Sequence, residues 1–173
     1  MCIRDSMKRI FFFITILSFL SIACSTDDSD MASVEGVWKL TAYNVADGFD
    51  VNSDGIKNIN LLNEMECLNN EVLVFESNGS MHSSSTFNPV IQIYRLNEVT
   101  NEYGFNVECD IEGVISYATS YSQKGNTIIF NNHHASIADN QLYIVFEDAI
   151  EIFNADFTKV LAREDLTLVY AKQ

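Results

Sequence analysis

The segment EVLVFESNGSMHSSST, residues 71–86, decides the fold class of this protein. Residues 71–76 and 80–86 belong to a series of alternating or β-branched segments of the kind that form strands. Between them stands Ser77-Asn78-Gly79. An Asn-Gly pair is the strongest short signal for a β-hairpin, because both residues tolerate the positive φ of its tight turn. The segment therefore predicts two antiparallel strands joined by a turn.

Segments of the same kind recur on both sides of this hairpin, separated by turn residues. The predicted strands cover residues 34–45, 71–76, 80–86, 90–96, 103–110, 114–122, 127–131, 141–146, 149–153 and 165–172. Only residues 59–67 (INLLNEMEC) predict a short helix, inside the long loop after the first strand. Sequential antiparallel strands predict an all-β meander barrel or a sandwich. We favour a single barrel of about eight to ten strands, because a closed barrel leaves no exposed strand edge.

The first 23 residues have the features of export rather than of a folded domain. Residues 1–6 resemble a translated adapter remnant and are left out of the fold prediction. Lys8 and Arg9 then precede an uncharged, mostly apolar run over residues 10–23. This run is too short to cross a bilayer core about 30 Å thick. It has the length of the apolar region of a secretory signal, so residues 7–23 are expected to be a signal peptide.

The apolar run ends in Leu20-Ser21-Ile22-Ala23-Cys24, which resembles the lipobox of bacterial lipoproteins. The resemblance implies that Cys24 carries a diacylglyceryl group, and two or three acyl chains hold a protein firmly at a membrane. Residues 24–33, rich in Ser and Asp, have the composition of a flexible tether. They also resemble an export signal of surface lipoproteins in Gram-negative bacteria. The expected location is the outer membrane, at the cell surface or on its periplasmic face.

The chain that follows the signal peptide is strongly acidic. Of 10 basic and 24 acidic residues, removal of Arg4, Lys8, Arg9 and Asp5 leaves 7 and 23, a net charge of −16. Such a surface argues against nucleic acid as a partner and makes cations the more natural small partners. Residues 34–173 are long and apolar enough for one folded domain.

Two cysteines, Cys67 and Cys109, lie within this domain. In an exported protein such a pair is expected to form a disulfide, because the compartment is oxidising. Closing a loop of about 43 residues would contribute about 4 kcal/mol to stability in the chain-entropy model. The alternative is a pair of free buried thiols. No other Cys or His stands at the spacing of metal ligands near either residue.

Gly36-Val37-Trp38 opens the first predicted strand and resembles the G-x-W signature of lipocalins, whose Trp plugs the closed end of the barrel. In that family a basic residue on the last strand covers the Trp, and Arg163 is the best candidate here. A cation over an indole face contributes about 0.5–2 kcal/mol. Lipobox, acidic tether, GVWKLT, DVNSDG, FESNG and LTLVYAK together resemble the lipocalin-like domains of bacterial lipoproteins. Trp38 is also readily explained as a core aromatic residue.

Residues 50–58, DVNSDGIKN, match the front half of an EF-hand-type calcium loop. Calcium takes six to eight hard oxygens, and alternating short side chains in a tight loop can supply them. The possible ligands are side-chain oxygens, one backbone carbonyl and one carboxylate from the following segment: Asp50, Asn52, Asp54, Ile56, Asn58 and Glu64. Position 12 is Leu61 instead of the usual Glu, and Glu64 or Glu66 would have to replace it. The alternative is an Asp/Asn/Gly turn that binds nothing.

Two functions remain open at this point. The resemblance implies a binding module that holds a small apolar or amphipathic ligand in the barrel, and an apolar cavity of several hundred Å³ would favour it. The alternative is a structural or interaction lipoprotein with a filled barrel, whose loops contact a protein or glycan. We expect no enzyme, since no catalytic motif is present. His133-His134 is interpreted as an exposed pair in a turn, and His82 stands alone.

Overall fold

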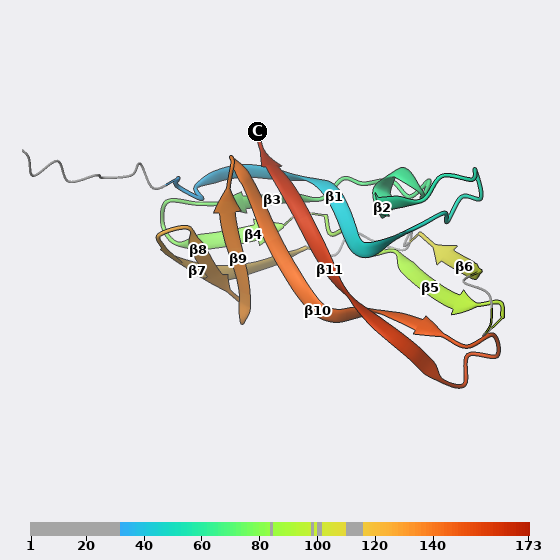
Figure 1. The fold of residues 1–173 in the computed structure, drawn as a ribbon. Coiled ribbons are helices and arrows are strands. Elements are labelled where there is room, and N and C mark those ends of the chain that lie inside the picture. Colours follow the sequence, from blue (N-terminus) through green and yellow to red (C-terminus); the bar gives the residue numbers. More distant parts are fainter. Residues whose placement is uncertain (1–31, 84, 98, 100–101, 110–115) are drawn as a thin grey trace, which may run out of the picture. The chain divides into compact units, whose positions relative to one another are not determined.

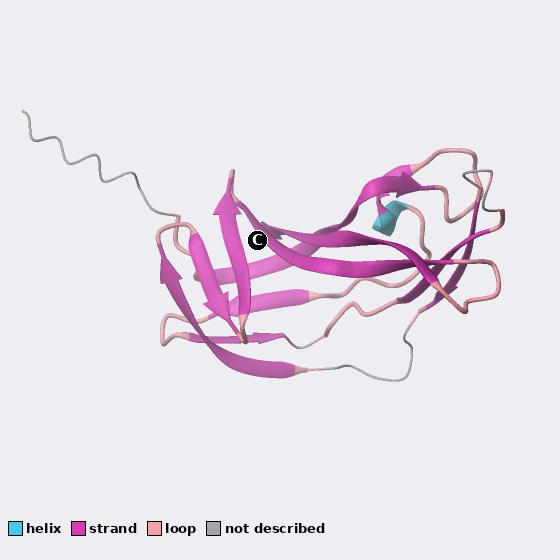
Figure 2. Ribbon diagram, turned by 60° about the horizontal axis from the view of Figure 1, so that its bottom comes forward, coloured by secondary structure: helices cyan, strands magenta, loops and turns pink. Residues whose placement is uncertain are grey.

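The computed structural model describes residues 32–83, 85–97, 99, 102–109 and 116–173. Over these residues 61 % of the chain is strand and no helix reaches seven residues, so the all-β prediction is confirmed (Figures 1 and 2). Within the same residues no helix combines the length and apolar character that a membrane crossing requires. Cys24, the predicted signal peptide at 7–23 and the tether up to residue 31 lie outside the described residues.

Eleven strands and one single-turn 3-10 helix follow one another in the described chain. They are β1 (Gly36–Phe49), β2 (Asn58–Asn60), η1 (Leu61–Asn63), β3 (Val72–Phe75), β4 (Ser80–Ser83), β5 (Val90–Arg95), β6 (Tyr103–Glu108), β7 (Tyr117–Lys124), β8 (Thr127–Phe130), β9 (His133–Ala138), β10 (Gln141–Phe153) and β11 (Val160–Lys172).

Eight of the strands close into a barrel in the order β1-β3-β4-β7-β8-β9-β10-β11, and β11 pairs back with β1. All neighbours around this ring are antiparallel. The order follows the sequence apart from two insertions, which are β2 with η1 between β1 and β3, and the β5–β6 hairpin between β4 and β7. The predicted meander barrel is therefore confirmed.

Alternation of side chains explains which face of each strand is buried. Every second residue of β3, β8 and the first half of β10 is buried, as the two-residue period of a strand requires. In β1 the register against β11 shifts between Leu40 and Ala42. A bulge of this kind changes which residues point inward, so Trp38 and Leu40 are buried before it and Tyr43 and Val45 after it.

The structure contains two strands that the sequence did not predict, β2 and β9, and it joins two predicted strands into β10. Tight turns made by Asn131-Asn132 and Asp139-Asn140 lie on either side of β9, and all four residues have φ between 46° and 63°. Two residues with positive φ match the twist of a hairpin, which explains both sharp reversals. β10 continues through an irregularity between Phe146 and Ile150.

The helix predicted at residues 59–67 is reduced to one turn. Asn58 and Asn60 pair with β1, and only Leu61–Asn63 form the 3-10 helix. The Asn60 side chain caps it by accepting a hydrogen bond from the Leu62 amide at 3.2 Å. The apolar residues that suggested a helix are explained by the burial of Leu61 in the core.

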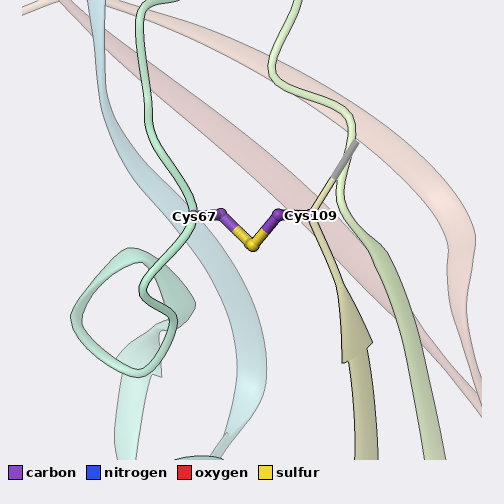
Figure 3. The surroundings of a disulfide bond; sticks show 2 residues. All are labelled: Cys67 and Cys109. Atoms are coloured by element: carbon purple, nitrogen blue, oxygen red, sulfur yellow. A yellow bond between two sulfur atoms is a disulfide. The ribbon is translucent and has the colours of Figure 1, made fainter. Parts of the chain in front are cut away.

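The β5–β6 hairpin attaches to the barrel through a short parallel pairing, in which Ile93 and Tyr94 of β5 face residues of β10. A disulfide between Cys67 and Cys109 joins the segment after η1 to the end of β6 (Figure 3). The disulfide prediction is therefore confirmed. The bond connects the two insertions of the barrel to each other.

Candidate functional site

The residues that lead into β1 are held against the barrel by hydrogen bonds. Trp38 is 1 % exposed, and its Nε1 donates a hydrogen bond to the Val34 carbonyl at 2.6 Å. Val34 is fully buried, and its amide donates to Oε1 of Gln123 on β7 at 3.0 Å. On the other side, Nζ of Lys172 on β11 donates to the Ser33 carbonyl at 2.8 Å. The lead-in is thus bonded to β7 on one side and to β11 on the other.

The cation over Trp38 is Lys172, and the prediction of Arg163 is wrong. Nζ of Lys172 lies 5.3 Å from the centre of the Trp38 ring, and the two residues are register partners. β11 begins at Val160, so Arg163 lies near its other end and forms an exposed ion pair with Glu151 at 2.7 Å. A basic residue of the last strand does lie over Trp38, as predicted. The register between β1 and β11 makes it Lys172 instead of Arg163.

Gly36 makes room for this cation. Its φ is +122°, and a Cβ at this position would lie 3.2 Å from Cε of Lys172. A larger residue would strain the backbone and push the lysine stem away. Gly36 thus leaves space for Lys172 over the Trp38 ring, and the barrel-closing role predicted for Gly36 and Trp38 stays a prediction.

A cavity of about 510 Å³ opens inside the barrel, lined by residues of β1, β7 to β11 and the segment that joins β4 to β5. Most of its wall is apolar and includes Ile91, Phe130, Ile144, Ile150, Leu166 and Leu168. Its polar groups include the Glu71 carboxylate and the side chains of Tyr43, Tyr117 and Tyr170. The cavity is therefore a mostly apolar chamber with an acidic group in its wall.

Glu71 is 3 % exposed and lies immediately before β3. Its Oε1 accepts a hydrogen bond from the Tyr170 hydroxyl at 2.5 Å, and its Oε2 accepts one from the Phe87 amide at 2.7 Å. Its backbone is held by the Leu40 amide, which donates to its carbonyl at 3.2 Å, and by Asn69 Oδ1, which accepts from its amide at 3.1 Å. The carboxylate is thus fixed in position.

Burial sets the electrostatics of this group. Desolvation raises the pKa of Glu71 above its usual value, while the hydrogen bonds from Tyr170 and Phe87 oppose that rise. Burial and the nearby Glu71 charge raise the pKa of both Tyr43 and Tyr117 to about 12. The same causes raise the pKa of Tyr170 further. The three hydroxyls therefore stay protonated near neutral pH and remain hydrogen-bond donors.

The histidine pair belongs to a strand, so its placement in a turn is wrong. His133 and His134 open β9 and point to opposite faces, as adjacent strand residues must. His133 is half-buried and lines the cavity, with its ring 5.0 Å from that of Phe146. His134 is exposed.

The Asp/Asn loop after β1 is held by hydrogen bonds among its own atoms. The Asp50 carboxylate accepts from the amides of Asp54 and Gly55, each at 2.9 Å. Asn52 Oδ1 accepts from the Asp54 amide at 3.0 Å, and the Asp54 carboxylate accepts from the Ile56 amide at 2.8 Å. Backbone amides therefore donate to side-chain oxygens of Asp50, Asn52 and Asp54, three of the predicted calcium ligands.

Glu64 reaches this loop from the residue after η1 and is 4 % exposed. Its Oε2 accepts from the amides of Val51 at 2.9 Å and Asn52 at 3.3 Å, and its Oε1 accepts from the Asn58 side chain. In the part of the chain that the structure describes, no three His, Cys, Asp or Glu side chains form a group that could hold a metal ion. Calcium binding by this loop stays a prediction.

Replacing Glu64 with Gln is expected to lower the free energy of unfolding by about 1–3 kcal/mol in EDTA, because a buried carboxylate that accepts several hydrogen bonds loses one acceptor and its charge. Urea unfolding measures the loss. Glu66→Gln is the matched control, since Glu66 is exposed two residues later. Equal stability of the two variants contradicts this role for Glu64. A calcium-dependent rise in the melting temperature that Glu64→Gln loses would establish the calcium site.

The sequence did not identify Glu71 or the three tyrosines as site residues. Glu71 is one of many acidic residues, and no motif surrounds it. Its only local signal is its place directly before the apolar strand β3.

No protein-family model, curated protein or solved structure matches this chain.

Proposed function

We propose that this protein is a lipid-anchored, surface-displayed lipoprotein whose lipocalin-like barrel binds a small apolar or amphipathic molecule. The cavity of about 510 Å³ carries the proposal. Small-molecule sites are mostly apolar hollows of about 300–1,000 Å³ with a few placed polar groups. The chamber around Glu71 has this size and this composition.

The closed end supports the likeness to lipocalins. Trp38 is buried, and a basic residue of the last strand lies over its ring. The ring order of the eight strands is also that of an up-and-down barrel. On this proposal Trp38 closes one end of the barrel, and a ligand enters elsewhere.

The anchor and the location rest on the sequence. Cys24 ends a lipobox-like segment, and residues 24–33 form an acidic tether that holds the domain away from the membrane. Incorporation of labelled fatty acid into the protein, and its loss in Cys24→Ser, tests the anchor. Accessibility of the domain to protease on intact cells tests surface display.

The competing proposal is an interaction lipoprotein that contacts a protein or glycan through its loops. It requires no internal space, and a filled barrel interior would favour it. A cavity lined by Ile144, Leu166 and Leu168 instead favours the binding module.

Binding of a neutral naphthylamine dye, whose fluorescence rises in apolar surroundings, tests the proposal. Ala149 is exposed and lines the cavity, so Ala149→Trp places an indole at the chamber without disturbing the core. We expect the variant to bind the dye about tenfold more weakly than the wild type, because the indole takes up part of the ligand's volume. Ile129→Trp is the control, since Ile129 is 43 % exposed on β8 and is not part of the cavity wall. Absence of saturable binding to the wild type, or equal binding by Ala149→Trp, contradicts the proposal.

A further inference from the structure

We propose that the ligand carries a protonated amine, which binds against Glu71 while its apolar body fills the rest of the cavity. This inference rests on the proposed function, because it names the class of molecule that the same cavity takes. It is carried by a carboxylate that is 3 % exposed and yet lines an open chamber.

The hydrogen bonds of Glu71 leave room for another donor. The Tyr170 hydroxyl and the Phe87 amide each occupy one carboxylate oxygen. An ionised carboxylate offers about four lone-pair sites, so these two bonds use about half of its capacity. Because Glu71 is part of the cavity wall, the remaining capacity is within reach of a bound molecule.

Among the described residues that line the cavity, none brings a fixed positive charge to Glu71. None of the described cavity residues is Lys or Arg, and His133 is the one basic side chain among them. The groups that face Glu71 are the hydroxyls of Tyr170 on β11, Tyr43 on β1 and Tyr117 on β7. All three are neutral donors with raised pKa values, and none neutralises the carboxylate.

An ammonium group on the ligand would complete the site. Folding has already removed water from Glu71. Binding therefore adds only the free-energy cost of dehydrating the ligand's ammonium group. Burial raises the pKa of Glu71, and a bound cation opposes that rise because it favours the charged carboxylate. Binding of the amine therefore tightens as the pH rises through the raised pKa of Glu71.

The same site disfavours ligands with an acid head group. A carboxylate beside Glu71 would place two like charges in a poorly solvated chamber, which is strongly unfavourable. The net charge of −16 after the predicted cleavage also attracts cations and repels anions at longer range. Fatty acids are therefore poor candidates, and amphipathic amines are good ones.

Three probes with one octyl chain and different head groups separate these possibilities. Octylamine, octanol and octanoate are titrated into the wild-type protein by calorimetry or by displacement of the neutral dye. We expect octylamine to bind about 10- to 100-fold more tightly than octanol, because a hydrogen bond to a charged group changes the affinity by a factor of this size. Octanoate is expected to bind most weakly.

Glu71→Gln tests the role of the carboxylate directly. It is expected to remove the advantage of octylamine over octanol and its dependence on pH, while octanol affinity changes by less than about threefold. Glu76→Gln is the matched control, because Glu76 is exposed at the other end of β3 and loses the same charge. If Glu71→Gln does not fold, the comparison of head groups on the wild type decides alone.

The outcomes distinguish the two proposals. Equal binding of octylamine and octanol to the wild type overturns the amine inference and leaves the binding module intact. Tighter binding of octanoate also overturns it. Failure of the dye and of all three probes to bind overturns the proposed function, and the amine inference with it. Preferential octylamine binding that Glu71→Gln abolishes and Glu76→Gln retains supports both.

Discussion

Replacing Cys67 and Cys109 together with alanine is expected to lower the free energy of unfolding by about 4 kcal/mol. The two cysteines are 42 residues apart in sequence, so the bond removes a large part of the conformational freedom of the unfolded chain. Urea unfolding of the oxidised protein and of the double variant measures the difference. Wild-type protein unfolded under reducing conditions is the control, because it lacks the bond and keeps both side chains.

The place of the bond in the fold adds a second expectation. The β5–β6 hairpin lies outside the barrel ring and pairs with β10 over two register pairs. Its other contacts include the rings of Tyr103 and Phe105 on β6, which lie 5.2 Å and 5.8 Å from that of Phe49. Because Ile91 of β5 lines the cavity, loosening the hairpin is also expected to weaken dye binding. An unchanged urea midpoint in the double variant contradicts the stabilising role of the bond.

Trp38→Ala is expected to cost about 3–5 kcal/mol, the range for removing a large aromatic side chain from a core. Trp38 is 1 % exposed, and the variant also leaves the Val34 carbonyl without its hydrogen bond. The cation of Lys172 loses the ring beneath it. Thermal and urea unfolding measure the effect, and Trp38→Phe, which keeps an aromatic ring, is expected to lose less.

Lys172 and Arg163 provide a matched pair of controls for this end of the barrel. Lys172→Met removes the cation over the indole and is expected to cost about 0.5–2 kcal/mol. Arg163→Met removes only an ion pair whose side chains are 49 % and 38 % exposed, and pairs of this kind contribute about 0–1 kcal/mol. A larger loss in Arg163→Met than in Lys172→Met contradicts the assignment of Lys172 to Trp38.

Features encoded over a few residues were predictable. Ser77-Asn78-Gly79 separates β3 from β4 as expected, with Gly79 at a φ of +82°. The alternation of β3 and the first half of β10 marks their buried faces. Asn131-Asn132 makes an equally tight turn, but it lacks the glycine that made the first turn recognisable. This is why β9 escaped prediction.

The disulfide was predictable for a different reason. Cys67 and Cys109 are the two cysteines of the sequence within residues 34–173, so no choice of partner arises inside the predicted domain. The cation over Trp38 offered a choice between Arg163 and Lys172, and local patterns could not make it. The register between β1 and β11 decides it, because a shift of one residue turns every side chain to the other face of the sheet.

The sequence by itself determined that this protein is an all-β meander, where the Asn78-Gly79 turn falls and which cysteines pair, since these depend on local backbone preferences and on composition. Only the tertiary structure decided which polar groups share the interior. Closure of the barrel brings Tyr170 to Glu71 across 99 residues of sequence, together with Tyr43 and Tyr117. Those contacts depend on the registers of all eight strands at once, and no short stretch of sequence encodes them.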